Sequence, residues 1–109
     1  MDFDELLEFI STEDKRLRNK YGNYSDEEKR VLVRLVKLGE EFGELSSEVL
    51  ANNSFQRTEK LEKHSKESTE EEFADVMITT LLLAQAMDID IKKALKDKID
   101  KINKRYTSI

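Results

Sequence analysis

The chain has 109 residues, enough for one domain, and we expect a single domain over residues 1–109. It has no cysteine, which excludes disulfides and thiol nucleophiles, and its net charge of −5 argues against nucleic acid as a partner. The start of the chain lacks a signal-peptide pattern, and the most apolar run, residues 76–87, is too short to span a bilayer. We therefore expect a soluble, cytoplasmic protein that binds no membrane.

The apolar spacing predicts that the chain is all-α, beginning with two long helices. The first covers about residues 2–20 and ends before Tyr21 and Gly22. Ser25 with Glu28 three residues later resembles a capping box, which would start a second helix that continues to about Leu50. The core-facing stripes would be Phe3, Leu6, Leu7, Ile10 and Leu17 on the first helix, and Val31, Leu35, Leu38, Phe42, Leu45 and Val49 on the second.

A polar segment over residues 52–66 reads as a connection to two further helices. Ser68 or Thr69 would cap the third helix, which runs to about Met87 and is apolar nearly all round from Val76 onward. Asp90 would cap the fourth, and its stripe would be Ile91, Leu95, Ile99, Ile102 and Tyr106. These elements predict a four-helix-type bundle with the third helix at its centre, completed by oligomerisation.

Two pairs of carboxylates lie at i and i+3 on helices expected to face each other. Glu41 and Glu44 share one face of the second helix, and Glu72 and Asp75 share one face of the third. Carboxylates from two facing helices can hold a hard cation, and all-oxygen ligation favours Mg²⁺ or Mn²⁺. The same spacing recurs elsewhere in this acidic chain, where it is typical of solvated surface residues.

Two features distinguish these pairs from the other acidic pairs. Glu72 and Asp75 lie at the entrance to the most apolar helix, where a desolvated carboxylate is costly unless a cation matches it. Gly39 and Gly43 lower the stability of the second helix, which indicates close approach of another backbone or of a ligand. The helical wheel, in contrast, places Glu44 away from the apolar stripe and predicts that it is exposed.

Residues 37–45, Lys-Leu-Gly-Glu-Glu-Phe-Gly-Glu-Leu, resemble the first signature of MazG-like pyrophosphohydrolases, which carries an ExxE metal motif. Residues 71–76, Glu-Glu-Phe-Ala-Asp-Val, resemble the second signature, an ExxD motif. Further along, Leu83-Ala84, Asp88-Ile89-Asp90-Ile91, Ala94, Lys98 and Arg105-Tyr106 follow the family's pattern in order. The resemblance covers about residues 37–106 and is interrupted by the polar connection.

The resemblance implies a helical homodimer or homotetramer that hydrolyses nucleoside or deoxynucleoside triphosphates to a nucleoside monophosphate and pyrophosphate. Glu41, Glu44, Glu72 and Asp75 would hold the catalytic Mg²⁺. Lys98 falls on a family position used for triphosphate contact and shares a helix face with Lys101 and Arg105. Lys37, four residues before Glu41, would be a further basic partner of the site or an ordinary surface ion pair.

The chain departs from the family pattern at three places. Ile102 stands where many members have an asparagine, and Met87 or Asp88 replaces the glycine of the turn before the last helix. No aromatic motif for base stacking is evident in the first thirty residues, where Tyr21 and Tyr24 are the candidates. The preferred base therefore cannot be predicted from the sequence.

Three other functions are alternatives to the pyrophosphohydrolase. A di-iron carboxylate site would need Glu-x-x-His pairs, but the one histidine, His64, lies in the polar connection. A non-catalytic helical oligomeric interaction module fits the apolar helices equally well, and Mg²⁺ would then not stabilise the protein. A third alternative keeps the fold and changes the substrate to a modified or damaged nucleotide.

Overall fold

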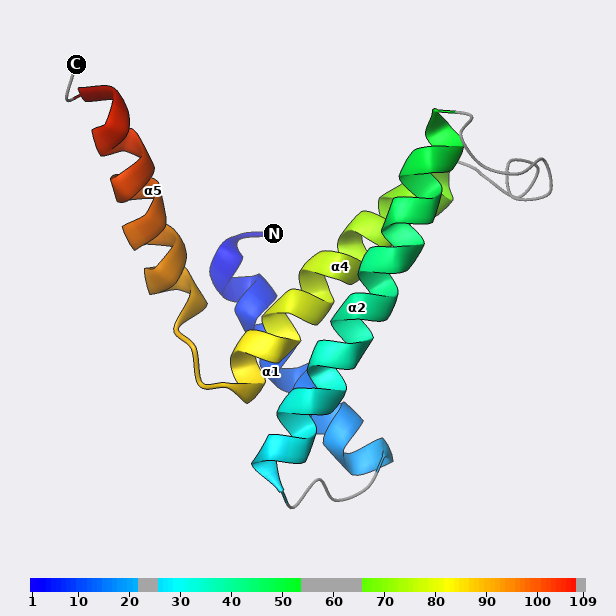
Figure 1. The fold of residues 1–109 in the computed structure, drawn as a ribbon. Coiled ribbons are helices and arrows are strands. Elements are labelled where there is room, and N and C mark those ends of the chain that lie inside the picture. The colour runs from blue at the N-terminus through cyan, green and yellow to red at the C-terminus, as the bar shows by residue number, and fades with distance from the viewer. Residues whose placement is uncertain (22–25, 54–65, 108–109) are drawn as a thin grey trace.

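The computed structural model describes residues 1–21, 26–53 and 66–107, and in these ranges the chain forms four helices and no strand. They are α1 (Phe3–Lys20), α2 (Glu27–Asn52), α4 (Lys66–Ala86) and α5 (Ile91–Thr107), shown in Figure 1. The predicted all-α fold class is confirmed. Over the same ranges, no helix is both long and apolar enough to cross a membrane.

Acidic side chains cap three of the helices. Asp2 accepts a hydrogen bond from the Glu5 backbone N–H at 2.8 Å, and Asp90 accepts one from the Lys93 N–H at 3.1 Å, as predicted for Asp90. The cap of α2 is Asp26, which accepts from the Glu28 N–H at 3.0 Å. Ser25, Tyr24 and His64 lie outside the described residues.

The predicted caps of the third helix are wrong, because α4 already begins at Lys66. Ser68 and Thr69 lie within its first turn, and their hydroxyl groups point across to α2. They donate to Glu48 Oε2 at 3.0 Å and 3.4 Å respectively. These two residues therefore join α4 to α2 and do not start the helix.

α4 is the central helix, as predicted: α2 lies alongside it and α1 crosses it near its C-terminal end (Figure 1). The buried core lies at the crossing with α1 and consists of Ile10, Leu81 and Leu82. Half-buried aliphatic side chains surround it: Leu6, Leu7, Leu17, Ile78 and Ile91. The predicted stripe of α1 thus packs into the core, which fixes α1 against the apolar half of α4.

The predicted core-facing stripe of α2 is wrong in part: Val31, Leu38 and Leu45 are half-buried, but the other three residues of the stripe are exposed. Leu35 and Phe42 are 52% and 61% exposed, whereas Arg34, Glu41 and Ala51 are buried. The inward face of the helix therefore mixes polar with aliphatic side chains, and much of its apolar surface stays in solvent. Arg34 and Glu48 of this face have partners on α1 and α4, which lowers the cost of burying them, whereas Glu41 Oε2 has no hydrogen-bond partner.

α5 also leaves its apolar stripe uncovered. It stands apart from α2 and projects away from the end of α4 (Figure 1). Leu95, Ile99 and Tyr106 are 45%, 54% and 73% exposed, and Ile91 alone of the predicted stripe joins the periphery of the core. Lys92 ties the start of α5 to α1 through Asp4 at 2.9 Å.

The two glycines of α2 do not mark close packing within the chain. A Cβ atom built on Gly39 or Gly43 would meet no atom within 4 Å. The expected approach of another backbone is therefore absent among the described residues.

Asp88 occupies the left-handed conformation that ends α4, with φ of 55°. The Ile89 N–H donates to the Ala84 carbonyl at 3.0 Å, and the Asp88 N–H donates to the Gln85 carbonyl at 3.2 Å. This is the hydrogen-bond pattern of a helix end that normally carries glycine at the left-handed position. Of the two positions that the resemblance offers for a glycine, Met87 and Asp88, Asp88 is the one with the left-handed backbone.

Asp88→Gly should raise the free energy of unfolding by about 0.5–1 kcal/mol, because glycine removes the steric cost of the left-handed backbone. Urea unfolding followed by circular dichroism, at one fixed protein concentration, measures the change. Asp88→Ala is the matched control and should be less stable than Asp88→Gly. If the glycine variant is no more stable than the alanine variant, the left-handed backbone at Asp88 carries no steric cost and the prediction is wrong.

Candidate metal centre

Three carboxylates from α2 and α4 converge where the two helices lie side by side. Glu41 of α2 is buried, Glu72 of α4 is half-buried, and Asp75 follows one turn later on the same face of α4. One carboxylate oxygen from each of the three lies within 4.8 Å of the others. The pairing of α2 with α4 therefore brings together three of the four predicted metal ligands.

Glu44, the fourth predicted ligand, is exposed and lies at the edge of this cluster. It remains close enough to Glu72 to share a hydrogen bond with it, and its negative charge helps to raise the pKa of Glu72. Glu41, Glu72 and Asp75 are called the acidic cluster below, with Glu44 as its neighbour.

The acidic cluster is electrostatically unfavourable without a cation. Burial raises the pKa of Glu72 to about 7, helped by the charge and hydrogen bond of Glu44 and by the charges of Asp75 and Glu41. Glu41 Oε2 and Glu72 Oε2 are buried and have no hydrogen-bond partner. Buried carboxylate oxygens that lack hydrogen-bond partners and come from two helices fit a hard divalent cation. The cation would supply the positive charge that the cluster lacks.

The raised pKa of Glu72 predicts how pH affects the metal-free protein. Between pH 4.5 and about 7 the folded state binds a proton at Glu72 that the unfolded state has released. This carboxyl therefore lowers the free energy of unfolding as pH rises through that window. Urea unfolding with a chelator at pH 5, 6, 7 and 8 measures the free energy of unfolding across the window. Glu72→Gln should remove the contribution of Glu72 to its fall with rising pH. Parallel pH profiles of wild type and variant would contradict the prediction.

Basic and hydroxyl groups border the acidic cluster. Lys37 Nζ lies 3.4 Å from Glu41 Oε1 and 3.4 Å from Glu40 Oε2, and these two carboxylates raise the pKa of Lys37. Thr79, one turn after Asp75, is buried and donates its hydroxyl to the Asp75 backbone carbonyl. Lys37 is therefore a direct neighbour of the acidic cluster.

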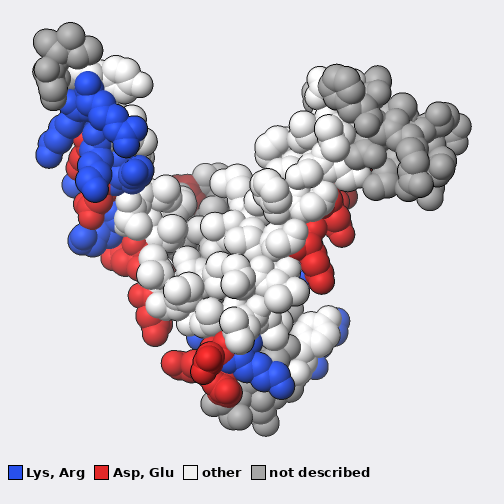
Figure 2. Space-filling model, in the orientation of Figure 1, with Lys and Arg blue, Asp and Glu red and all other residues white. Residues whose placement is uncertain are grey.

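The predicted triphosphate-binding residues of the last helix do not reach the acidic cluster within one chain. Lys98 and Arg105 are exposed on α5, which stands away from α2 and from the half of α4 that carries Glu72 (Figure 1). Figure 2 shows the basic side chains of α5 gathered at one extremity of the molecule. Uncharged surface separates them from the acidic side chains near α2.

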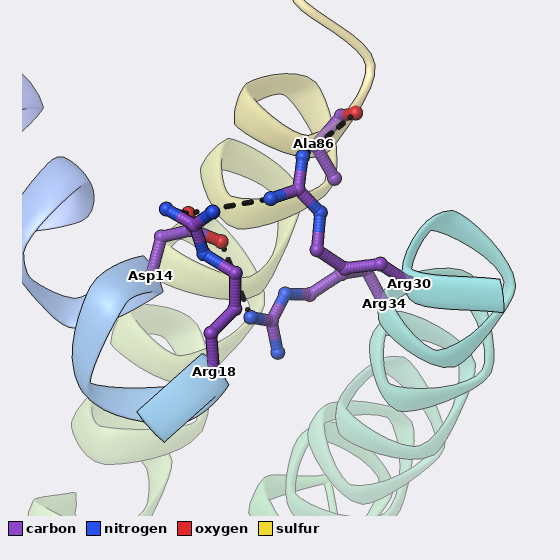
Figure 3. A network of polar contacts seen from close by, with 5 residues as sticks. All are labelled: Asp14, Arg18, Arg30, Arg34 and Ala86. Carbon is purple, nitrogen blue, oxygen red and sulfur yellow. Dashed lines mark hydrogen bonds and ion pairs between the residues drawn. The ribbon is translucent and has the colours of Figure 1, made fainter. Parts of the chain in front are cut away.

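A buried ion-pair network, absent from the predictions, fixes the other end of α2. Asp14 of α1 is 1% exposed and pairs with Arg34 at 3.3 Å, Arg18 at 3.0 Å and Arg30 at 3.7 Å (Figure 3). Arg30 also donates to the carbonyl of Ala86 at the end of α4, at 3.3 Å. One carboxylate thus links α1 to α2, and Arg30 extends the link to α4.

The sequence does contain a signal for this network. On α2, Arg30, Arg34, Glu41 and Glu48 follow one another at helical spacings of four, seven and seven, which places them on one face. Either that polar face or the apolar stripe of α2 could be the one buried in the fold. The face carries both arginines and glutamates. Periodicity within α2 cannot show which groups on α1 and α4 contact them.

Comparison with known proteins gives one match. A model of the MazG-like family matches residues 36–109, a span that holds both halves of the acidic cluster, α4 and α5. No curated protein and no solved structure matches the chain significantly. α1, with Asp14, lies outside the matched span.

Proposed function

Because this chain belongs to the MazG-like family, which includes nucleoside triphosphate pyrophosphohydrolases, we propose that it hydrolyses nucleoside or deoxynucleoside triphosphates between the α and β phosphates. The products would be a nucleoside monophosphate and pyrophosphate. The observation that carries the proposal is the acidic cluster, with buried oxygens of Glu41 and Glu72 that lack partners.

The residues of the acidic cluster would hold Mg²⁺, or Mn²⁺ in its place. Glu41, Glu72 and Asp75 offer one oxygen each within a span that one ion can bridge, and Glu44 is near enough to join them. The bound ion would offset phosphate charge and acidify a water molecule for attack. Rigid packing of α2 on α4 would keep the carboxylates in place before substrate arrives, which limits reorganisation during the reaction.

Lys37 would act at the border between the acidic cluster and the substrate. Its contact with Glu41 would orient that carboxylate, and its side chain is 57% exposed, which leaves room for a phosphate oxygen beside it. Lys98 and Arg105 would contact the triphosphate only from a second copy of the chain, because their own helix holds them away from the acidic cluster.

A homodimer or homotetramer is proposed on the basis of the uncovered apolar faces. Val36 and Phe42 of α2 are 63% and 61% exposed, and Leu95 and Ile99 of α5 are 45% and 54% exposed. Apolar faces of this extent are typical of subunit interfaces. Light scattering after gel filtration tests the assembly, and a monomeric mass at assay concentration would contradict it.

The same apolar faces support the second candidate, a non-catalytic interaction module. The two candidates differ in their response to metal. A pyrophosphohydrolase should gain thermal stability from Mg²⁺ or Mn²⁺ by mass action, whereas an interaction module should not. The acidic cluster favours the enzyme.

The test of the proposed function is a product analysis. The standard NTPs and dNTPs are incubated with the protein and Mg²⁺, and monophosphate, diphosphate, phosphate and pyrophosphate are separated by chromatography. Monophosphate with equimolar pyrophosphate, lost on chelation, is the expected result. Diphosphate with phosphate would overturn the bond assignment. No turnover, with no metal-dependent stabilisation, would favour the interaction module.

A further inference from the structure

A cavity of about 400 Å³ lies between α1, α2 and α4, within the range of ~300–1,000 Å³ found for small-molecule sites. Aliphatic side chains form much of its wall, together with one phenol ring and four polar groups. The lining residues are Glu13, Leu17, Tyr21, Val33, Arg34, Lys37, Thr79 and Leu82.

The cavity adjoins the acidic cluster through two of its lining residues. Lys37 Nζ lies 3.4 Å from Glu41 Oε1, and Thr79 bonds to the backbone carbonyl of Asp75. Each lies one helical turn from a carboxylate of the cluster. A ligand with a phosphate group at the acidic cluster could therefore extend its remaining part into the cavity.

The chemistry of the wall favours a nucleobase over a polyphosphate. Glu13 would repel a phosphate chain, and the charge of Arg34 is already engaged by Asp14 at 3.3 Å. Lys37, the other cation of the wall, pairs with Glu41 at 3.4 Å and so lies at the border with the acidic cluster, where the phosphates are proposed to bind. Leu17, Val33 and Leu82 offer apolar contact to the faces of a planar ring. A base buries apolar faces and presents polar edges, which matches a wall that combines aliphatic side chains with polar groups.

Glu13 is the group in the wall that would read the edge of the base. Its side chain is 29% exposed, and its partner, Arg16, is 63% exposed at 3.5 Å, which makes a weak pair that is easily exchanged. An ionised carboxylate only accepts hydrogen bonds. Guanine presents two adjacent donors, N1–H and the N2 amino group, which match the two carboxylate oxygens. Adenine and cytosine present one amino donor beside a ring acceptor, and uracil presents one N–H between two carbonyls.

We propose that this cavity is the nucleobase subsite of the proposed pyrophosphohydrolase and that Glu13 makes it selective for guanine nucleotides. The inference rests on the proposed function for its reaction, but the binding of the base does not require turnover. It assigns a role to α1, the helix that lies outside the matched family span.

The experiment compares wild type with Glu13→Gln in two measurements. The first is kcat/KM for GTP, ATP, CTP and UTP with Mg²⁺. Wild type should prefer GTP by about tenfold or more, and Glu13→Gln should lower that preference about 10–100-fold, mainly through a higher KM for GTP. The second is calorimetric titration with GMP and with AMP. Wild type should bind GMP more tightly, and the variant should lose the difference.

Glu8→Gln is the matched control, since Glu8 is an exposed carboxylate on α1 that does not line the cavity, and it should keep the wild-type preference. If both proteins hydrolyse triphosphates and the ratio of kcat/KM for GTP to that for ATP is the same in wild type and Glu13→Gln, the base assignment is overturned. The proposed function would still stand. Selective GMP binding without turnover of any triphosphate would support the subsite and contradict the proposed function. If the protein neither binds GMP selectively nor hydrolyses any triphosphate, both the subsite and the proposed function are overturned.

Discussion

Glu41→Gln and Glu72→Gln should each lower kcat/KM for nucleoside triphosphate hydrolysis by about 10³-fold, with helical content unchanged. Both residues are buried or half-buried, and each has an oxygen without a partner in the acidic cluster. Glutamine keeps the shape of the side chain but removes its charge and one acceptor oxygen. The metal-free fold should tolerate the change, because removing one of several converging charges relieves repulsion around Glu72.

Steady-state kinetics with Mg²⁺, together with far-ultraviolet circular dichroism, measures both parts of this prediction. Glu70→Gln is the matched control: it removes the same charge from an exposed position of α4 and should keep nearly full activity. The metal-dependent rise in Tm should also be smaller in the two cluster variants than in the control. Full activity in both Glu41→Gln and Glu72→Gln would exclude the acidic cluster as the metal centre.

Asp14→Ala should lower the free energy of unfolding by about 3–5 kcal/mol. Asp14 is 1% exposed and is the carboxylate shared by Arg18, Arg30 and Arg34. Arg34 is itself buried, and the Nε atoms of Arg30 and Arg34 have no hydrogen-bond partner. Without Asp14, buried guanidinium charge would lose its counter-charge, which costs more than the ion pair itself contributes.

Urea unfolding at fixed protein concentration measures this loss, and Asp14→Asn provides a milder variant where the alanine variant does not fold. Arg18→Gln is the control at the exposed edge of the network and should cost under about 1 kcal/mol. Replacing Asp14 by leucine and Arg34 by methionine together should cost less than Asp14→Ala alone, because the buried charge of Arg34 is then no longer left without a counter-charge. A loss below about 1 kcal/mol in Asp14→Ala would show that the network adds little to stability.

The sequence predicted the local structure well, because helix formation depends mostly on neighbouring residues. The helical segments appear with ends within a few residues of those expected, and Asp90 caps the last helix as predicted. The ends that differ are those where a side chain found a distant partner: Ser68 and Thr69 bond to Glu48 on α2 and do not cap α4. Capping propensity cannot account for a partner twenty residues away.

The sequence also identified Glu41, Glu72 and Asp75 as candidates, since their spacing on each helix is a local property. Their convergence is a property of the pairing of α2 with α4. So are the orphaned oxygens and the raised pKa of Glu72, because burial and like charge arise only where the two helices meet.

What the sequence by itself determined is therefore the set of helices, the faces that each helix offers and the family to which the chain belongs. The tertiary structure decided which face goes inside. α2 carries both an apolar stripe through Leu35 and Phe42 and a polar stripe through Arg34 and Glu41, and periodicity gives both stripes without ranking them. Asp14 on α1 supplies the partner of Arg34, whereas Glu41 is buried beside the like charges of Glu72 and Asp75, which the proposed cation would offset. Contacts between distant segments therefore decide which stripe is buried.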